Sequence, residues 1–197
     1  MPRRIRVLLR RRQASALAEL LDSAAPRTCE TVWSALPLEG PVFHAKRANN
    51  EIYILVPPFA PTGPGLENGT IVPAFGDLVY FYFPPERVVS YLTGLRGVIP
   101  EDVLADAAAR GLIDLAVFYA GNNLLFDYLG ATPGAVFAQI KQGLAEMAEA
   151  CQDVWYAAQR AKPCGSNARS DRKPRQTQRD GSLQYGADRS PTILPDQ

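Results

Sequence analysis

The sequence contains few of the residues that metal and nucleophile chemistry require. It has one histidine, His44, and three cysteines, Cys29, Cys151 and Cys164, with no Cys-x-x-Cys pair. A single histidine excludes zinc sites built on several imidazoles, and a Ser-His-Asp triad could use only His44. Cys29 and Cys151 fall in apolar helical patterns, so we interpret both as buried, reduced thiols. We therefore expect no metal ion and no cofactor.

An excess of charge of one sign and long apolar runs are also lacking. The chain has 21 Lys and Arg against 20 Asp and Glu, a formal net charge of +1, so its global charge does not attract nucleic acid or a membrane. No apolar run approaches the roughly 20 residues that span a bilayer. The basic start, with Arg3, Arg4 and Arg6, lacks the apolar core of a secretory signal. We expect a cytoplasmic protein with neither a membrane nor a nucleic acid as partner.

The composition divides the chain into one domain and a tail. A length of 197 residues suits a single domain of ordinary size with a terminal extension. Residues 164–197 are rich in Gly, Ser, Asn, Gln, Asp and Arg, and such a segment buries too little apolar surface to offset its ordering entropy. We predict a domain over residues 1–162 and a disordered tail over residues 163–197. The tail is weakly basic, which leaves a nonspecific RNA contact as the alternative to an inert segment.

Apolar periodicity predicts a mainly β domain. Period-2 alternation or short β-branched and aromatic runs, bounded by turn residues, indicate strands. The predicted strands are residues 5–9, 17–21, 41–46, 51–56, 77–83, 113–119 and 136–140.

Three segments are typical of helices. One is opened by Pro26 and ends before Pro37, and a second runs from Pro100 to Arg110 with Gly111 closing it. A third is predicted over residues 142–160, although the apolar spacing from residue 137 onward would also suit one longer helix interrupted by Gly143. Its apolar stripe favours packing on its own domain, with a coiled-coil homo-oligomer as the alternative.

Two segments at opposite ends of the domain resemble cyclophilins. The stretch AELLDSAAPRTCETVWSALPL, residues 18–38, reads as a strand followed by a short helix, like the opening of a cyclophilin barrel. The stretch VFAQIKQGL, residues 136–144, resembles the closing strand and the Gly-Leu helix start of the same family.

The segments between these two ends resemble a prokaryotic cyclophilin-like family known as domain of unknown function 3830. They are PLEGPVFHAK, NEIYILVPPF, ENGTIVP-x-x-GDLVYFY and NNLLF, and the resemblance covers about residues 4 to 158. It implies a closed, eight-stranded and mainly antiparallel β-barrel with two or three capping helices.

The departures from the cyclophilin pattern bear on activity. The peptidyl-prolyl isomerases of that family carry an arginine directly after Phe-His, whereas here Phe43-His44 is followed by Ala45. Rotation about an X–Pro bond has a barrier near 20 kcal/mol, and lowering it requires electrostatic or hydrogen-bonding help that an alanine side chain does not supply. Lys46 or Arg47 could act from a neighbouring position in a divergent isomerase, with a different geometry.

Strand alternation also predicts a candidate ligand site. If the fully apolar residue sets fill the barrel, the remaining polar and aromatic side chains line an outer sheet face, with two asparagines at its rim. These residues are His44, Lys46, Glu51, Tyr53, Tyr80, Tyr82, Asn122 and Asn123. The alternative is that they are ordinary cross-strand pairs of a half-exposed sheet. His44 beside Glu51 or Tyr53 would be the one plausible acid–base pair, but no nucleophile, metal set or phosphate loop accompanies it, so we assign no catalytic residue.

The sequence therefore favours a cyclophilin-like protein that binds a small polar metabolite or a peptide segment without isomerising it. A divergent peptidyl-prolyl isomerase is the enzymatic alternative. An accessory subunit that docks on a metabolic enzyme is the third reading.

Overall fold

The computed structural model describes residues 2–45, 48, 50–60, 62–92, 101–127, 130–160 and 182–187. The strands are β1 (Arg4–Leu9), β2 (Ala14–Leu20), β3 (Leu38–His44), β4 (Glu51–Val56), β5 (Gly69–Thr70), β6 (Asp77–Phe83), β7 (Leu112–Phe118), β8 (Phe126–Asp127), β9 (Gly130–Ala131), β10 (Gly134–Gln142) and β11 (Ser182–Ala187). The helices are η1 (Arg10–Arg12), α1 (Pro26–Ala35), α2 (Pro85–Leu92), α3 (Glu101–Arg110) and α4 (Leu144–Arg160). All seven strands and three helices predicted above are present, with small shifts at their ends; α2 was not predicted.

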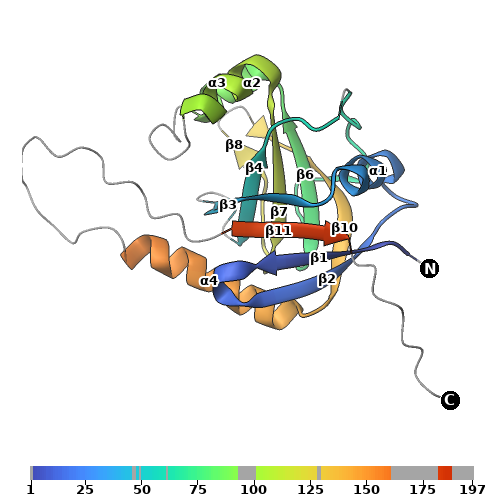
Figure 1. Cartoon of the computed structure of the whole chain (residues 1–197), viewed down its shortest axis with the longest axis vertical. Helices are drawn as coiled ribbons and strands as arrows, with labels where there is room; N and C mark the ends of the chain where they lie inside the picture. The colour runs from blue at the N-terminus through green and yellow to red at the C-terminus, as the bar shows by residue number, and fades with distance from the viewer. Residues whose placement is uncertain are drawn as a thin grey trace, which may run out of the picture.

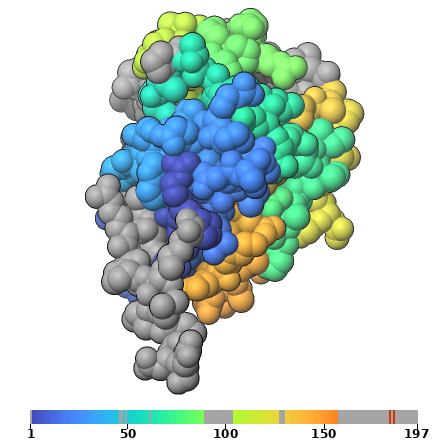
Figure 2. Space-filling view, turned by 90° about the vertical axis from the view of Figure 1, so that its right-hand side faces the viewer, coloured from blue at the N-terminus to red at the C-terminus, as the bar shows by residue number. Residues whose placement is uncertain are grey.

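Nine strands form one curled antiparallel sheet in the order β2-β1-β11-β3-β4-β7-β6-β10-β5, and β8 and β9 form a separate pair. The curl brings β2 back against β10, where Leu20 is opposite Ala138 and Ala18 is opposite Ile140. Figure 2 shows the result on the surface, where the N-terminal residues in blue lie next to the orange residues of β10 and α4. The first hairpin and β10 therefore pair, as the resemblance to cyclophilins implies.

The closed eight-stranded barrel is nevertheless wrong as a description of this sheet. The edge of β10 is divided, because residues from Ala138 onward pair with β2 while Gly134 and Ala135 pair with the short strand β5. The seam between β2 and β10 thus covers only part of β10, and it contains a register shift between Ile140 and Gln142. The sheet is a mainly antiparallel half-barrel.

The tail prediction is also corrected. Residues 182–187, predicted to be disordered, form β11, which lies between β1 and β3 (Figure 1, red arrow). The rest of the predicted tail lies outside the described residues. A six-residue strand in a polar segment carries little local signal, because its order depends on the two strands that flank it.

Buried side chains gather on both faces of the sheet. We call one group the inner cluster; it draws on all the longer strands and on α1 and α4. The other, the outer cluster, covers the opposite face of β4, β6, β7 and β10 and includes Val88 of α2 and Ala107 of α3. Figure 1 shows α2 and α3 together at one end of these strands, well away from α4. Because both faces are covered, β4 and β7 are buried along their whole length.

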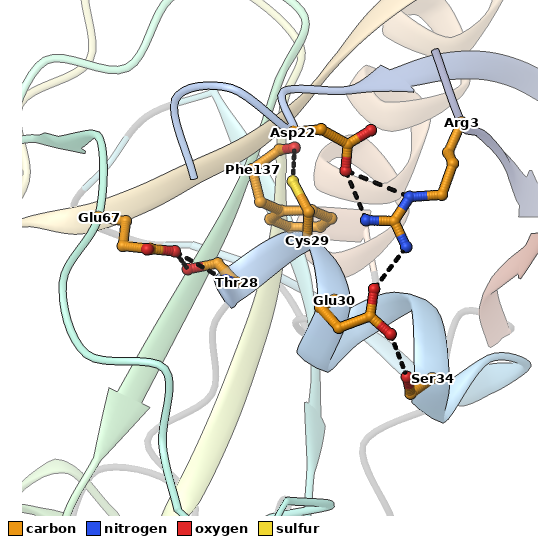
Figure 3. Close-up of polar contacts among 8 residues, drawn as sticks. All are labelled: Arg3, Asp22, Thr28, Cys29, Glu30, Ser34, Glu67 and Phe137. Carbon is orange, nitrogen blue, oxygen red and sulfur yellow. Dashed lines mark hydrogen bonds and ion pairs between the residues drawn. The ribbon is translucent and has the colours of Figure 1, made fainter. Parts of the chain in front are cut away.

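A carboxylate from a distant loop completes the start of α1. Ala25 precedes Pro26 and provides no side-chain cap. Instead Glu67 accepts hydrogen bonds from the backbone N–H and the hydroxyl of Thr28, at 2.8 and 3.0 Å (Figure 3). On the same helix the thiol of Cys29 donates to the carbonyl of Phe137 in β10, at 3.2 Å, which ties α1 to the sheet.

Among the described residues, none of the helices is both long enough and apolar enough to cross a membrane.

Candidate functional site

The one histidine of the chain lies at the end of β3, on the same face as Val42 of the inner cluster. Its ring is half-buried between two aromatic side chains that come from other elements. The Nε2 atom of His44 lies 2.5 Å from the hydroxyl of Tyr119, directly after β7, and the ring centroid of Trp155 in α4 lies 4.8 Å from that of His44. We call His44, Tyr119 and Trp155 the histidine cluster.

The hydrogen bonds of His44 determine which nitrogen carries the proton. Nδ1 lies 2.8 Å from the carbonyl oxygen of Ala45, which can only accept a hydrogen bond. Nδ1 is therefore the protonated nitrogen of the neutral ring, and Nε2 accepts the hydrogen bond that the hydroxyl of Tyr119 donates. If the hydroxyl of Tyr119 donated its hydrogen bond to a ligand instead, Nε2 of His44 would be free to accept a hydrogen bond from a donor on the same ligand.

Burial favours the neutral forms of both partners. Desolvation lowers the pKa of His44, although the hydrogen bond to the carbonyl of Ala45 opposes this effect. Desolvation also raises the pKa of Tyr119 to about 12, with a smaller contribution from Cys151. Near neutral pH the cluster thus holds an uncharged imidazole and an uncharged phenol, a pair suited to hydrogen bonding with a polar ligand.

Glu51 and Tyr53 lie on the opposite face of the sheet from His44, which corrects the expected acid–base pairing. Tyr53 belongs to the outer cluster and stacks on Phe43, with ring centroids 5.6 Å apart. Ala45 donates its N–H to the carbonyl of Glu51, so alternation directs the side chains of Glu51 and His44 to opposite faces. The partner of His44 is Tyr119.

Glu51 instead interacts electrostatically with Asp114 of β7. Both carboxyl groups are buried, and Oδ1 of Asp114 has no hydrogen-bond partner among the described residues. Desolvation raises the pKa of Glu51 to about 8, and desolvation together with the charge of Glu51 raises the pKa of Asp114 well above its usual range. Both groups favour their protonated forms, as expected of carboxyl groups that are buried away from solvent.

The two tyrosines of β6, Tyr80 and Tyr82, contact residues outside the histidine cluster. Tyr80 belongs to the inner cluster and meets Phe59 edge to face, at 6.4 Å between ring centroids. Tyr82 is 44% exposed, and its hydroxyl is 3.5 Å from the carbonyl oxygen of Arg110 at the end of α3. Lys46 lies outside the described residues.

The two asparagines of the expected rim have different roles. Asn122 is exposed and adopts a left-handed backbone conformation with φ of 61°, which confirms the predicted turn after β7. Asn123 is buried, and its amide donates to the carbonyls of Ala120 at 2.6 Å and Pro73 at 3.3 Å. Asn123 therefore holds two loops together.

The members of the predicted set that the structure describes are thus divided among separate places in the fold and do not form one outer face. Three residues that the structure brings into these contacts were absent from the predicted set: Tyr119, Trp155 and Asp114. The signal available for Tyr119 was its place at the end of a strand whose alternation also contains Val117, a member of the inner cluster. Trp155 directly follows Val154 of the apolar stripe in α4, and only the packing of α4 brings it to His44. Within the part of the chain that the structure describes, no three His, Cys, Asp or Glu side chains are placed to hold a metal ion.

Comparisons with known proteins identify a family and a fold neighbour. A family model described as "Protein of unknown function (DUF3830)" matches residues 7–162. No curated protein matches the chain in sequence. Among solved structures, one described as "Structure of McbB in complex with tryptophan" is similar, with a TM-score of 0.53 and 13% sequence identity. The match covers 96% of this chain but only 46% of the McbB chain, so this chain spans less than half the length of that neighbour. At this identity the likeness shows the fold alone.

Proposed function

The chain belongs to the DUF3830 family of proteins of unknown function, and from that premise we propose that it binds a small polar metabolite or a peptide segment without isomerising it. The observation that carries this proposal is the histidine cluster, in which a neutral imidazole, a phenol and an indole from three different elements converge. Such a set offers hydrogen bonding to the polar part of a ligand and an aromatic surface to its apolar part.

The chemistry of the cluster favours a ligand with an amide or carboxyl group next to an apolar or aromatic group. The phenol of Tyr119 donates to an incoming oxygen, and Nε2 of His44 then accepts from an N–H or O–H. Tyr156, next to Trp155 on α4, is 54% exposed and adds aromatic surface beside the cluster. The McbB structure contains tryptophan, a molecule with this combination of groups, and tryptophan is therefore a reasonable first probe.

The proposal that the protein does not isomerise its ligand is supported by the two residues that follow Phe43. Ala45 stands where the isomerases carry an arginine, and His44 is held neutral by burial, so neither supplies a cation to the twisted amide. Lowering the barrier of about 20 kcal/mol requires electrostatic or hydrogen-bonding help at the twisted amide, and a cation is the help that the isomerases' arginine provides. A cytoplasmic location is part of the proposal and is supported by the free, buried thiols of Cys29 and Cys151.

Calorimetry and NMR test the binding site. We expect tryptophan or small N-acyl amino acids to shift the imidazole resonances of His44 and to bind the wild-type protein. Tyr119→Phe keeps the ring but removes the donor, and we expect it to weaken binding about 5- to 10-fold, in line with roughly 1 kcal/mol for a lost hydrogen bond. Tyr82→Phe is the matched control, because that phenol is exposed and its hydroxyl lies 3.5 Å from the carbonyl oxygen of Arg110 at the end of α3, outside the histidine cluster. Equal affinities of the two variants would contradict the assignment.

An isomerisation assay on X–Pro peptides tests the second half of the proposal. We expect the wild-type protein and His44→Ala to leave the uncatalysed rate unchanged. Acceleration by the wild type that is lost in Lys46→Ala or Arg47→Ala would favour the divergent isomerase instead.

A further inference from the structure

We propose that the histidine cluster selects an uncharged ligand group that carries an oxygen acceptor and an N–H donor on one edge, and that a carboxylate binds there only when His44 takes up one proton. A primary amide is the simplest group of this kind. The selection concerns the same ligand whose binding is proposed above, and it therefore rests on that proposed function.

The backbone fixes one of the two ring nitrogens of His44 as a donor. Nδ1 lies 2.8 Å from the carbonyl oxygen of Ala45, which accepts in both protonation states of the ring, so Nδ1 keeps its proton. Nε2, 2.5 Å from the hydroxyl oxygen of Tyr119, accepts a hydrogen bond in the neutral ring and donates one in the charged ring. The state of this one atom therefore decides which ligand groups the cluster pairs with.

A primary amide matches the neutral cluster. Its carbonyl oxygen accepts from the hydroxyl of Tyr119, while the N–H on the same side donates to Nε2 of His44. Covalent geometry places the oxygen and nitrogen atoms of an amide about 2.3 Å apart. This spacing is close to the 2.5 Å between the hydroxyl oxygen and Nε2. Both polar atoms of the cluster keep a partner, so the amide binds without any change of charge.

A carboxylate leaves Nε2 without a donor. Its two oxygens only accept hydrogen bonds, so one accepts from the hydroxyl of Tyr119 and the other faces the lone pair of Nε2. In a half-buried site such an unmade hydrogen bond costs free energy. One proton from the solvent, bound at Nε2, removes this cost and forms an imidazolium–carboxylate pair. Because burial lowers the pKa of His44, that proton is expensive to bind at neutral pH.

The titratable groups described around the cluster supply no positive charge. On α4, Cys151 and Tyr156 interact electrostatically with Tyr119, and desolvation raises the pKa of the Cys151 thiol, which therefore stays neutral. On β4, the residue opposite His44 is Ile52, and Glu51 lies on the other face of the sheet.

Three more charged residues are close to the cluster in sequence. Asp153, two residues before Trp155, forms an ion pair with Arg12 at 2.9 Å. Lys46 and Arg47 follow His44 closely and lie outside the described residues. A cation from either would hold a carboxylate without proton uptake, and the experiment below distinguishes that case.

Indole-3-acetamide and indole-3-acetate are matched probes, because they differ only in the amide and the carboxylate. At pH 8, where His44 is neutral, we expect the amide to bind the wild-type protein at least about tenfold more tightly. From pH 7 to pH 8 the affinity for the acetate should fall by close to tenfold, at about one proton bound per ligand, while that for the amide stays constant. Calorimetry in phosphate and in Tris, which differ in ionisation enthalpy, measures this proton uptake directly. N-methyl-indole-3-acetamide is the control: its N–H points away from the carbonyl oxygen, so it should bind about fivefold or more weakly than the primary amide.

The single histidine of the chain provides a readout in the wild-type protein by NMR. The acetate should raise the pKa of His44, because it binds the charged ring, and the amide should lower it, because it binds the neutral ring. His44→Gln removes the titrating group, so the affinity for the acetate should no longer change between pH 6 and pH 8. Glu149→Gln, an exposed change on α4, should keep the pH dependence of the wild type.

Equal affinities for the amide and the acetate at pH 8 would overturn the selection and leave the proposed function standing. Acetate binding without proton uptake would do the same and would assign the carboxylate to a cation such as Lys46 or Arg47. If neither probe bound between pH 6 and pH 8, the proposed function would be overturned together with the selection.

Discussion

Glu51 and Asp114 show how burial decides the state of individual residues in this protein. Each carboxyl group lies in the interior, where the charged form loses its hydration, and the charge of Glu51 adds to the cost of ionising Asp114. Raised carboxyl pKa values are common at functional sites, but here the pair lies on the opposite face of the sheet from the histidine cluster. We therefore interpret it as a determinant of the pH dependence of stability.

Substituting Glu51 tests this interpretation. In the folded state the carboxyl group of Glu51 has a pKa of about 8, whereas in the unfolded chain it has the ordinary pKa of 4.5. The contribution of Glu51 to the free energy of unfolding is therefore fully present below pH 4.5. It is lost as the pH rises through 8, with a slope of at most about 1.4 kcal/mol per pH unit. Glu51→Gln should flatten the dependence of the free energy of unfolding on pH between 5 and 8, as measured by urea denaturation.

The control for this experiment is Glu149→Gln, which changes an exposed carboxylate on α4. Its pH profile should follow that of the wild type. His44 contributes a trend of the opposite sign: its pKa is lowered in the folded state, so its contribution is present above pH 6.5 and is lost as the pH falls. All of these proteins contain His44, so the difference between their profiles reports on Glu51 together with its effect on Asp114. A Glu51→Gln profile parallel to the wild type would show that Glu51 is ionised in the folded protein.

At the scale of elements, ends and junctions depend on groups that lie far away in the sequence. The helix α1 has Pro26 at its start but lacks a local cap, and Glu67 from the loop before β5 supplies it. The junction of β10 and α4 depends on Gly143, whose φ is +74° and whose added Cβ would lie 2.4 Å from the carbonyl oxygen of Ser15. Both features join segments that local sequence patterns treat as independent.

Removing the distant cap should destabilise the protein. Glu67→Ala eliminates the acceptor for the N–H and hydroxyl of Thr28, and we expect a loss of about 1 kcal/mol in the free energy of unfolding. Glu30→Ala is the control on the same helix, because Glu30 forms an exposed ion pair with Arg3 and such pairs contribute little. Chemical denaturation of both variants measures the difference, and equal effects would argue against a capping role for Glu67.

A pair of glycine substitutions tests the junction. Gly143→Ala should cost more than about 1 kcal/mol, because alanine is strained at positive φ and its Cβ would also clash with the backbone of β2. Gly121→Ala is the matched control, since an added Cβ there would meet nothing within 4 Å and φ is not in the left-handed region. Thermal unfolding should show a clearly lower Tm for Gly143→Ala alone. Similar Tm values would contradict the close approach of this junction to β2.

At the scale of the whole molecule, the continuity of the sheet depends on β11. Without it, β1 and β3 lose their shared neighbour, and the inner cluster loses the side chains of Leu183 and Tyr185. Exposed strand edges also promote association between chains. The C-terminal segment therefore contributes to the stability of the domain, in contrast to the inert tail that its composition predicts.

Truncation tests whether the C-terminal segment stabilises the domain or is an inert tail. Ending the chain at residue 181 should lower the free energy of unfolding by several kcal/mol, because two fully buried side chains are removed, each contributing about 1.5 to 3 kcal/mol. It should also produce concentration-dependent association in light scattering. Ending the chain at residue 187 is the control and keeps β11. Equal stability of the two truncated proteins would contradict the contribution of β11 to the fold.

The sequence by itself determined the kind and position of most elements. Period-2 alternation and flanking turn residues depend only on neighbours along the chain, which is why β4 and β6 were predicted with the ends that the structure has. Pro26 and Gly111 similarly indicated where α1 begins and α3 ends, because their backbone preferences act locally. Alternation also correctly grouped Tyr53 with Glu51 and Tyr80 with Tyr82.

The tertiary structure decided which face each group occupies and what covers it. Alternation indicates that two residues share a face, but it does not indicate whether that face meets α4, the outer cluster or solvent. For this reason His44 was predicted on an outer face, whereas it lies on the face of the inner cluster. The partnership of His44 with Tyr119 and Trp155 joins three elements through packing alone. β11 likewise owes its order to the two strands beside it, because backbone pairing and the burial of Leu183 and Tyr185 become available only once the sheet has curled.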